Sequence, residues 1–192
     1  MSRGLGDVYK RQVSRDAASA LYMGIAHDTG VFQYSCTSPE TMRLAATLME
    51  KQIPYTEILE ETFYKKTYLQ NQVMGKALLE SMRLLNGKCI VSVMRQKDMD
   101  FFGVTTTDLD GIVSQMKQTK GIEVAIFLYE TDYMEYKVSL RSENIVDVSK
   151  VASYFGGGGH VRAAGVTMKG TFHDIVNNLT LHIERQLEGQ ED

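Results

Sequence analysis

Residues 156–165, GGGGHVRAAG, are the stretch that decides most about this chain. Glycine forfeits side-chain packing and costs entropy in any ordered state, so four in a row are typical of a loop that approaches another group closely. Backbone N–H groups in such a loop can converge on an anion, and His160 can donate to the same group. A flexible hinge followed by an incidental core histidine is the alternative. The charge of Arg162 and the small residues 163–165 favour the binding interpretation.

An alternating run upstream of the glycines, residues 134–141, predicts a strand with one apolar and one polar face. Arg141 and Ser139 lie on the polar face, where an arginine can bind a phosphate with two hydrogen bonds. Taken alone, Arg141 would be an ordinary solvated charge, and Lys137 on the same face is interpreted as one. The continuously apolar residues 124–129 predict a strand covered on both faces. A tight turn at Thr131 and Asp132 would join the two strands into a hairpin.

The remaining elements follow from helical and strand patterns outside this hairpin. Met42, Ala45, Ala46 and Met49 recur at helical spacing and predict a helix from Ser38 with one buried face. Helices are also expected at about 56–85, with a break near Lys65, and at 107–118, 148–155 and 172–187; short strands are expected at 89–93 and 163–168. The fold class is therefore α/β, with a domain boundary near Asn86.

Length and composition limit the function classes. The chain has 192 residues, a net charge of −3 and 43% hydrophobic residues, which fit one large domain or two small ones. A membrane span needs about 18 consecutive apolar residues, and none are present. Mild acidity argues against coating nucleic acid by bulk charge, so any phosphate binding must be local. Cys36 and Cys89 are far apart and indicate no disulfide framework, which favours a cytoplasmic location.

Residues 1–12 differ from the rest in being rich in glycine and basic residues, with no apolar segment typical of a secretory signal. They resemble adapter-derived translations at the ends of assembled environmental sequences. We interpret them as a non-native leader, with a native N-terminus as the alternative.

Residues 137–142 (KVSLRS), 157–160 (GGGH) and 163–165 (AAG) together resemble the DHH-associated C-terminal domain. That domain accompanies the DHH phosphoesterases, which include RecJ-like nucleases and the oligoribonuclease/3′-phosphoadenosine 5′-phosphate (PAP) phosphatases of the NrnA type. The resemblance runs from about Arg15 onward. It implies the end of a DHH α/β domain at 13–55, a helical connector at 56–86 and a small mixed-sheet α/β domain at 87–190. It also implies that the nucleotide is bound by Ser139, Arg141, Gly157, Gly158, Gly159 and His160.

Residues 24–32, GIAHDTGVF, are similar to the last metal-site motif of the DHH domain, and this similarity implies that Asp28 is a catalytic manganese ligand. Two divalent cations in such a site activate water and neutralise developing phosphate charge. Without the family, Asp28 would be interpreted as a turn residue, and the role of His27 stays open. The earlier motifs of the family, including Asp-His-His, do not occur here. The sequence therefore resembles the C-terminal portion of an enzyme whose catalytic N-terminal half is absent.

The sequence is consistent with three candidate functions. The first is a manganese-dependent phosphoesterase acting on short single-stranded oligonucleotides or on the nucleotide bisphosphate PAP, with the NrnA type favoured by the short length. The second is a stand-alone nucleotide or single-strand binding module without catalysis. The third is an accessory domain of a tRNA synthetase, against which the motif around Asp28 argues. No membrane partner is expected, and a homodimer is left open.

Overall fold

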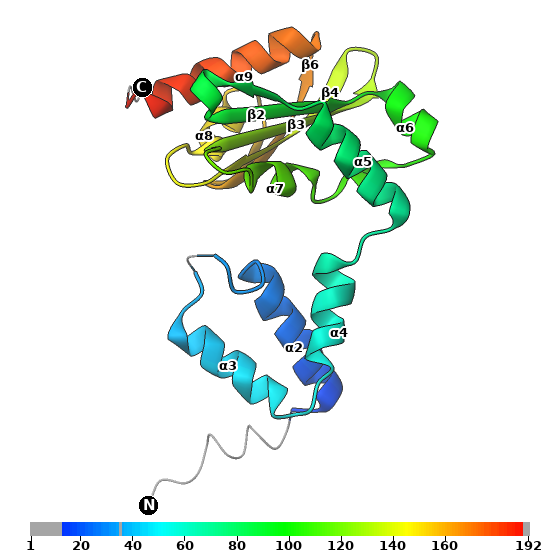
Figure 1. Cartoon of the computed structure of the whole chain (residues 1–192). Helices are drawn as coiled ribbons and strands as arrows, with labels where there is room; N and C mark the ends of the chain where they lie inside the picture. The colour runs from blue at the N-terminus through cyan, green and yellow to red at the C-terminus, as the bar shows by residue number, and fades with distance from the viewer. Residues whose placement is uncertain (1–12, 35, 190–192) are drawn as a thin grey trace, which may run out of the picture. The chain divides into compact units, whose positions relative to one another are not determined.

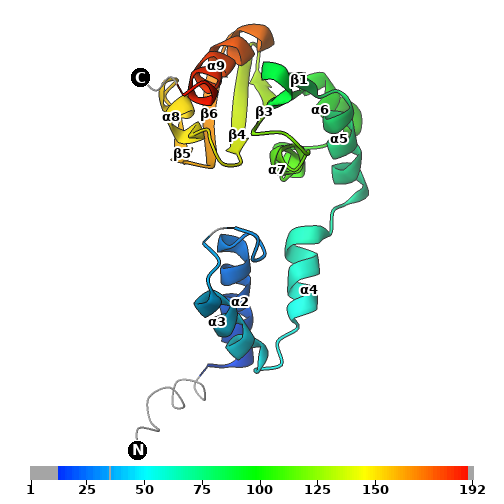
Figure 2. The same cartoon turned by 60° about the vertical axis from the view of Figure 1, so that its left-hand side comes forward.

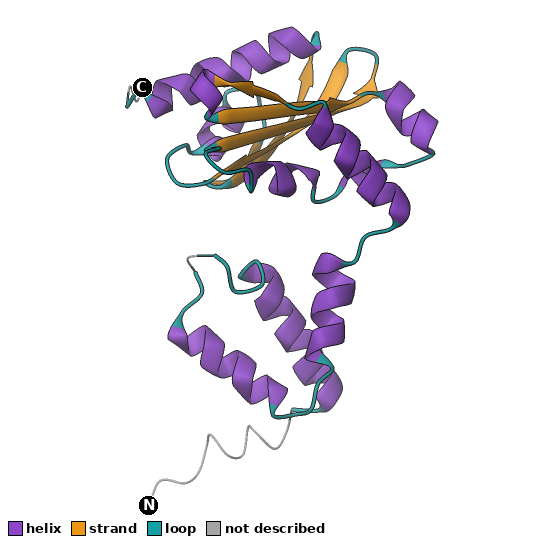
Figure 3. Cartoon of the chain, in the orientation of Figure 1, coloured by secondary structure: helices purple, strands orange, loops and turns teal. Residues whose placement is uncertain are grey.

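The computed structural model describes residues 13–34 and 36–189, so the expected leader at 1–12 lies outside the described residues. The chain divides into two compact units between Lys66 and Thr67. The described part of the first unit is helical, and all the described strands belong to the second (Figure 3).

The first unit contains α2 (Arg15–Asp28), α3 (Pro39–Met49) and α4 (Tyr55–Leu59), which continues into a π-helical turn at Glu60–Tyr64. Ser38 begins α3 as predicted: its Oγ accepts a hydrogen bond from the Thr41 N–H at 3.2 Å, and its own N–H donates to Thr41 Oγ1 at 3.3 Å. Such a reciprocal cap satisfies backbone donors that have no partner within the helix. A small core of Ala18, Tyr22, Ala45 and Ile53 holds the helices together.

The predicted buried face of α3 is wrong for most of its length. Ala45 is buried against the core of this unit, but Met42 is 51% and Met49 36% exposed. The periodicity marks an apolar stripe, and whether a stripe is buried depends on what lies against it. Among the described residues, Met42 and Met49 stay outside the core of this unit.

The second unit is built on a six-stranded sheet in the order β1-β2-β3-β4-β6-β5. Only β2 and β3 run parallel, and every other neighbouring pair is antiparallel. The strands are β1 (Met82–Leu84), β2 (Cys89–Met94), β3 (Val124–Asp132), β4 (Glu135–Ser142), β5 (Gly158–His160) and β6 (Ala163–Lys169). The mixed α/β class expected from the sequence is confirmed.

Helices cover the two faces of this sheet unequally. On one face, α8 (Val148–Ser153) and α9 (Phe172–Leu187) bury apolar side chains from β2, β3, β4 and β6 (Figure 1). On the other, α5 (Tyr68–Leu79), α6 (Gln96–Phe102) and α7 (Ile112–Lys117) share a second core with β2 and β3 (Figure 2). The predicted helix 172–187 is confirmed, since its periodic residues Ile175, Leu179 and Ile183 are fully or almost fully buried. No helix in the described part of the chain is both long and apolar enough to cross a membrane.

Two helix predictions and one turn prediction need correction. The expected helix at 56–85 breaks between Tyr64 and Tyr68, as predicted near Lys65, but it ends at Leu79, because Met82–Leu84 instead pairs with β2. The expected helix at 107–118 splits into a 3₁₀ turn (Thr106–Leu109) and α7, since Gly111 has a φ of +89° that no right-handed helix accepts. Helix α6 and strand β5 were not predicted. The hairpin turn lies at Tyr133 and Met134 rather than at 131 and 132, because β3 continues to Asp132.

Candidate functional site

The polar face predicted for β4 lies beside α7, where the sheet is only partly covered. The strand register aligns Arg141 with Ala163 and Ala163 with His160; one step along, Ser139 aligns with Gly165 and Gly165 with Gly158. Directly paired residues of antiparallel strands point to the same side. All of these residues are half-buried or exposed. We call this surface the open face: Lys137, Ser139, Arg141, Gly158, His160, Ala163, Gly165 and Thr167.

The glycines before His160 serve two different purposes. A Cβ on Gly157 would lie 2.4 Å from the Gly165 carbonyl oxygen, and one on Gly159 would lie 2.4 Å from the Ala163 carbonyl oxygen. Gly159 also has a φ of +151°, which other residues rarely adopt. A Cβ on Gly158 would meet nothing within 4 Å. Gly157 and Gly159 therefore let the backbone close onto β6, while Gly158 leaves open space on the exposed side.

Arg141 and His160 stand on either side of Ala163 in this arrangement. Two strand spacings separate them, or about 10 Å between their Cα atoms. The Arg141 Nη1 donates a hydrogen bond to the Leu140 carbonyl oxygen at 3.0 Å, which keeps its guanidinium near its own strand. His160 is exposed. A small floor between a guanidinium and an imidazole suits an anionic group that must approach the backbone closely.

Arg162 makes hydrogen bonds to backbone carbonyls that the sequence did not predict. Its Nη1 donates to the Val146 carbonyl oxygen at 2.9 Å, and its Nη2 donates to that of Asn144. These two hydrogen bonds hold the segment between β4 and α8.

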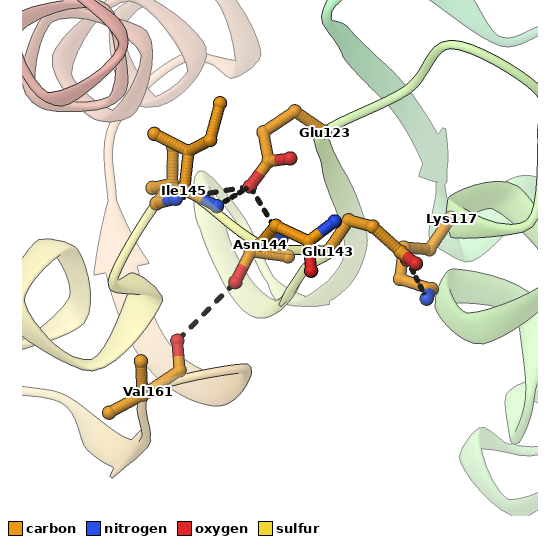
Figure 4. Close-up of polar contacts among 8 residues, drawn as sticks. Lys117, Glu123, Glu143, Asn144, Ile145 and Val161 are labelled. Atoms are coloured by element: carbon orange, nitrogen blue, oxygen red, sulfur yellow. Dashed lines mark hydrogen bonds and ion pairs between the residues drawn. The ribbon is translucent and has the colours of Figure 1, made fainter. Parts of the chain in front are cut away.

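Glu123 binds the backbone N–H groups of the same segment. The sequence did not predict this role for Glu123. Its Oε1 accepts hydrogen bonds from the N–H groups of Asn144, Ile145 and Val146 at 3.0, 2.6 and 3.0 Å (Figure 4). The residue is only 7% exposed, and three donors satisfy a carboxylate that burial would otherwise penalise. The signal in the sequence was an acidic residue directly before the fully apolar run 124–128.

Asp28, predicted to be a metal ligand, is the last residue of α2, and its side chain is 87% exposed. Its Oδ1 lies 3.5 Å from His27 Nδ1. Among residues 13–34 and 36–189, no three His, Cys, Asp or Glu side chains are grouped so that they could hold a metal ion. The donor set of this part of the chain therefore does not fit a two-metal centre, and the role of Asp28 stays a prediction.

The turn after Asp28 is unusual in its backbone. Gly30, Val31 and Phe32 have φ values of +56°, +56° and +64°. A left-handed residue costs roughly 1–2 kcal/mol unless it is glycine, and for β-branched valine this conformation is a clear outlier. Thr29 stabilises the turn, because its Oγ1 donates to the Ile25 carbonyl oxygen at 2.6 Å and accepts from the Phe32 N–H at 3.0 Å. Strain of this kind is concentrated at functional sites, which is consistent with the prediction for Asp28.

The two cysteines are both free thiols. Burial raises the pKa of Cys89 to about 12, so its thiol stays protonated and unreactive at neutral pH. Cys36 is exposed, and its Sγ lies 3.6 Å from the Asp28 carbonyl oxygen.

Comparison with known families shows a match of residues 86–188, more than half of the chain, to the DHHA1 domain. This chain belongs to the DHHA1 family. The matched residues contain the open face, Glu123 and Arg162. The resemblance to the DHH-associated domain is thereby confirmed, and DHH phosphoesterases are in general dependent on divalent metals.

Individual relatives agree with the family. The bifunctional oligoribonuclease and PAP phosphatase NrnA of Thermus thermophilus is 30% identical over 97% of this chain and 55% of its own length. The probable NrnA of Streptococcus mutans is 31% identical over 80% of this chain and 49% of its own length. An exopolyphosphatase-related protein from Bacteroides fragilis has the same fold, with a TM-score of 0.87 at 24% identity over 95% of this chain and 54% of the other. The DHHA1-family chain thus spans about half the length of the relatives that it matches.

Proposed function

We propose that this chain is part of a DHH-type phosphoesterase that hydrolyses short oligoribonucleotides and PAP, and that the open face binds the nucleotide. The observation that carries the proposal is the register of β4, β6 and β5, which puts Arg141 and His160 on the two sides of one partly covered floor. The names of the relatives supply the substrate class.

The chemistry of the open face suits a phosphorylated nucleotide. The Arg141 guanidinium can form charge-assisted hydrogen bonds to phosphate oxygens, which are shorter and stronger than neutral ones. His160 and the Ser139 hydroxyl can donate to the same group or to a sugar oxygen. Gly158, Ala163 and Gly165 keep the floor low, so that a phosphate or a flat base can approach the sheet.

The similarity around the strained turn makes Asp28 a proposed ligand of a manganese centre, which when bound supplies activated water and charge neutralisation. Its other ligands would have to lie outside the described residues, so we assign no step of hydrolysis to those residues. The extents 13–55 for the end of a DHH domain and 87–190 for the substrate-binding domain are part of this proposal, as is a cytoplasmic location.

Titration of the 192-residue chain with PAP tests the binding role. Arg141→Ala should weaken the affinity by about 1.5–3 kcal/mol, the range for a hydrogen bond to a charged group, or about 10- to 150-fold. Lys137→Ala is the matched control, because Lys137 is exposed on the same face of the same strand but aligns with Thr167, beyond the end of β5 and away from His160, and it should change the affinity far less. Equal affinities for wild type and Arg141→Ala, with unchanged circular dichroism, would rule out this role for Arg141.

Activity of the same chain tests the metal proposal. With manganese and a short oligoribonucleotide we expect no appreciable turnover, because the described residues do not supply a ligand set. Robust turnover that Asp28→Asn leaves unchanged would contradict the proposal that Asp28 is a metal ligand. It would also contradict the proposal that this chain binds the nucleotide without hydrolysing it. Binding without hydrolysis by a longer natural form of the protein would favour the alternative, a binding module.

A further inference from the structure

The two-residue turn between β5 and β6, directly after His160, has a backbone type that hairpins disfavour. Only Val161 and Arg162 separate β5 from β6. Two-residue hairpin turns strongly favour backbone types with a positive φ at the first or at both positions, because these match the twist of the strands. Neither Val161 nor Arg162 has a positive φ. The turn therefore needs support from outside the hairpin.

That support comes from the end of β4 and the start of α8. The Val161 carbonyl oxygen accepts from the Val148 N–H at 3.0 Å and from the Ser142 Oγ at 3.3 Å. The Arg162 carbonyl oxygen accepts from the Ser142 N–H at 3.2 Å. The guanidinium of Arg162 then reaches back to the carbonyls of Asn144 and Val146.

Glu123 binds the same segment, residues 144–146, that Arg162 binds. The buried carboxylate accepts hydrogen bonds from the three N–H groups of residues 144–146 (Figure 4). The Arg162 guanidinium donates to two carbonyls of the same residues. Opposite charges thus bind opposite polar groups of one short piece of backbone. Glu123 directly precedes β3, so the position of the segment is tied to the centre of the sheet.

We propose that Glu123 and Arg162 are positioning residues, which clamp residues 144–146 and through them fix the β5–β6 turn, so that His160 is held at a set distance from Arg141. Arg162 acts through this clamp and does not bind the ligand. The consequence for affinity rests on the proposed nucleotide-binding function; the consequence for the order of the turn does not.

Hydrogen exchange of backbone amides tests the clamp without any ligand. Arg162→Lys keeps the charge but loses the planar fork that bonds two carbonyls at once. We expect amides of residues 158–164 to exchange at least 10-fold faster in this variant, with exchange in α9 unchanged. Equal exchange rates in residues 158–164 for wild type and Arg162→Lys would overturn the proposal.

Titration with PAP separates positioning from direct contact. If Arg162 positions the turn, Arg162→Lys and Arg162→Ala should weaken binding to a similar degree, about 5- to 10-fold. If it binds phosphate directly, the lysine variant should retain most of the affinity that the alanine variant loses, and the proposal fails.

Variants of Glu123 provide a second test of the clamp. Glu123→Gln keeps an acceptor oxygen for the three N–H groups and should weaken binding only about 2-fold, whereas Glu123→Ala should approach the loss in Arg162→Lys. Because both residues act on one segment, combining Glu123→Ala with Arg162→Lys should add little further loss. Fully additive losses would show that the residues act separately.

The two levels of failure are distinguishable. A wild-type chain that binds no PAP refutes the proposed function, while the exchange experiment still decides the clamp. A wild-type chain that binds, with an Arg162→Lys variant that binds equally well, refutes the positioning role and leaves the proposed function standing.

Discussion

One face of the sheet has two halves that differ in what lies against them. Over β2 and β3, helices α5, α6 and α7 bury large side chains, and Phe127 is only 2% exposed. One strand further on, the direct neighbour of Phe127 is Ser139 and that of Ala125 is Arg141, and both neighbours are partly exposed. The opposite face shows no such change, since α8 and α9 share one core with strands from β2 to β6.

The two halves differ in side-chain type: one half carries residues that fill a core, and the other carries residues that leave the sheet accessible to a ligand. Where a helix covers the sheet, side chains fill the volume. On β4, β5 and β6 the same face is only partly covered, and these strands carry glycine, alanine and polar residues there, which give little packing stability and leave the backbone accessible. A binding role explains such a surface better than a packing role does.

The largest expected effect is in the covered half. Phe127→Ala should lower the free energy of unfolding by about 3–5 kcal/mol, because it empties a buried aromatic site. Ser139→Ala, its direct cross-strand neighbour, should change it by no more than about 0.5 kcal/mol. Urea denaturation of the two variants measures both values, and similar losses would remove the distinction between the halves.

Two adjacent glycines sharpen the comparison at the edge of the sheet. Gly157→Ala should cost about 1–3 kcal/mol of stability, because its Cβ would overlap backbone and side-chain atoms of β6. Gly158→Ala has open space and should leave stability nearly unchanged while weakening PAP binding. Thermal melting and titration of both variants test this, and the reverse ranking in stability would contradict the packing described for Gly157.

His160→Ala should affect binding and not folding. The side chain is exposed, so we expect a change in stability within about 0.5 kcal/mol. Loss of its hydrogen bond should weaken PAP affinity by about 0.5–1.5 kcal/mol if the acceptor is a sugar oxygen and by about 1.5–3 kcal/mol if it is a phosphate oxygen. A variant that binds normally but melts much earlier would show that His160 is a structural histidine instead.

The smallest effect concerns Asp147, the N-cap of α8, which leads into the glycine run. Partial burial alone would raise the pKa of this carboxyl, but hydrogen bonds from the Ser149 hydroxyl and the N–H groups of Lys150 and Ser149 outweigh it, and the pKa is lowered. A lowered pKa stabilises the fold above the unfolded-state value of about 3.9, and this contribution is lost as the pH falls through the folded-state value.

Asp147→Asn removes the titration and keeps a capping side chain. The stability difference between wild type and this variant should therefore be constant near neutral pH and change by less than about 1 kcal/mol below about pH 4. Denaturation at a series of pH values measures it. A difference that stays the same down to pH 2 would show that the hydrogen bonds at Asp147 do not depend on its charge.

The sequence by itself determined the elements whose signal is local. The apolar spacing of residues 172–187 defines α9, the alternation in 134–141 defines the two faces of β4, and the Ser38 cap defines the start of α3. The motifs in 137–165 were specific enough for the family. These features depend on residues close together in the chain, so the pattern and the structure report the same physics.

Only the tertiary structure decided what depends on distant partners. β1 and β5 are too short to be recognised until β2 and β6 pair with them, and the stripe on α3 shows apolar residues without showing whether anything covers them. The sequence alone does not show whether the Arg162 guanidinium binds a phosphate or backbone carbonyls. It donates to carbonyls because residues 144–146 lie within hydrogen-bond distance. Local sequence sets which groups a residue offers; the fold decides which groups meet them, because hydrogen bonds and burial depend on neighbours that the chain brings together from far apart.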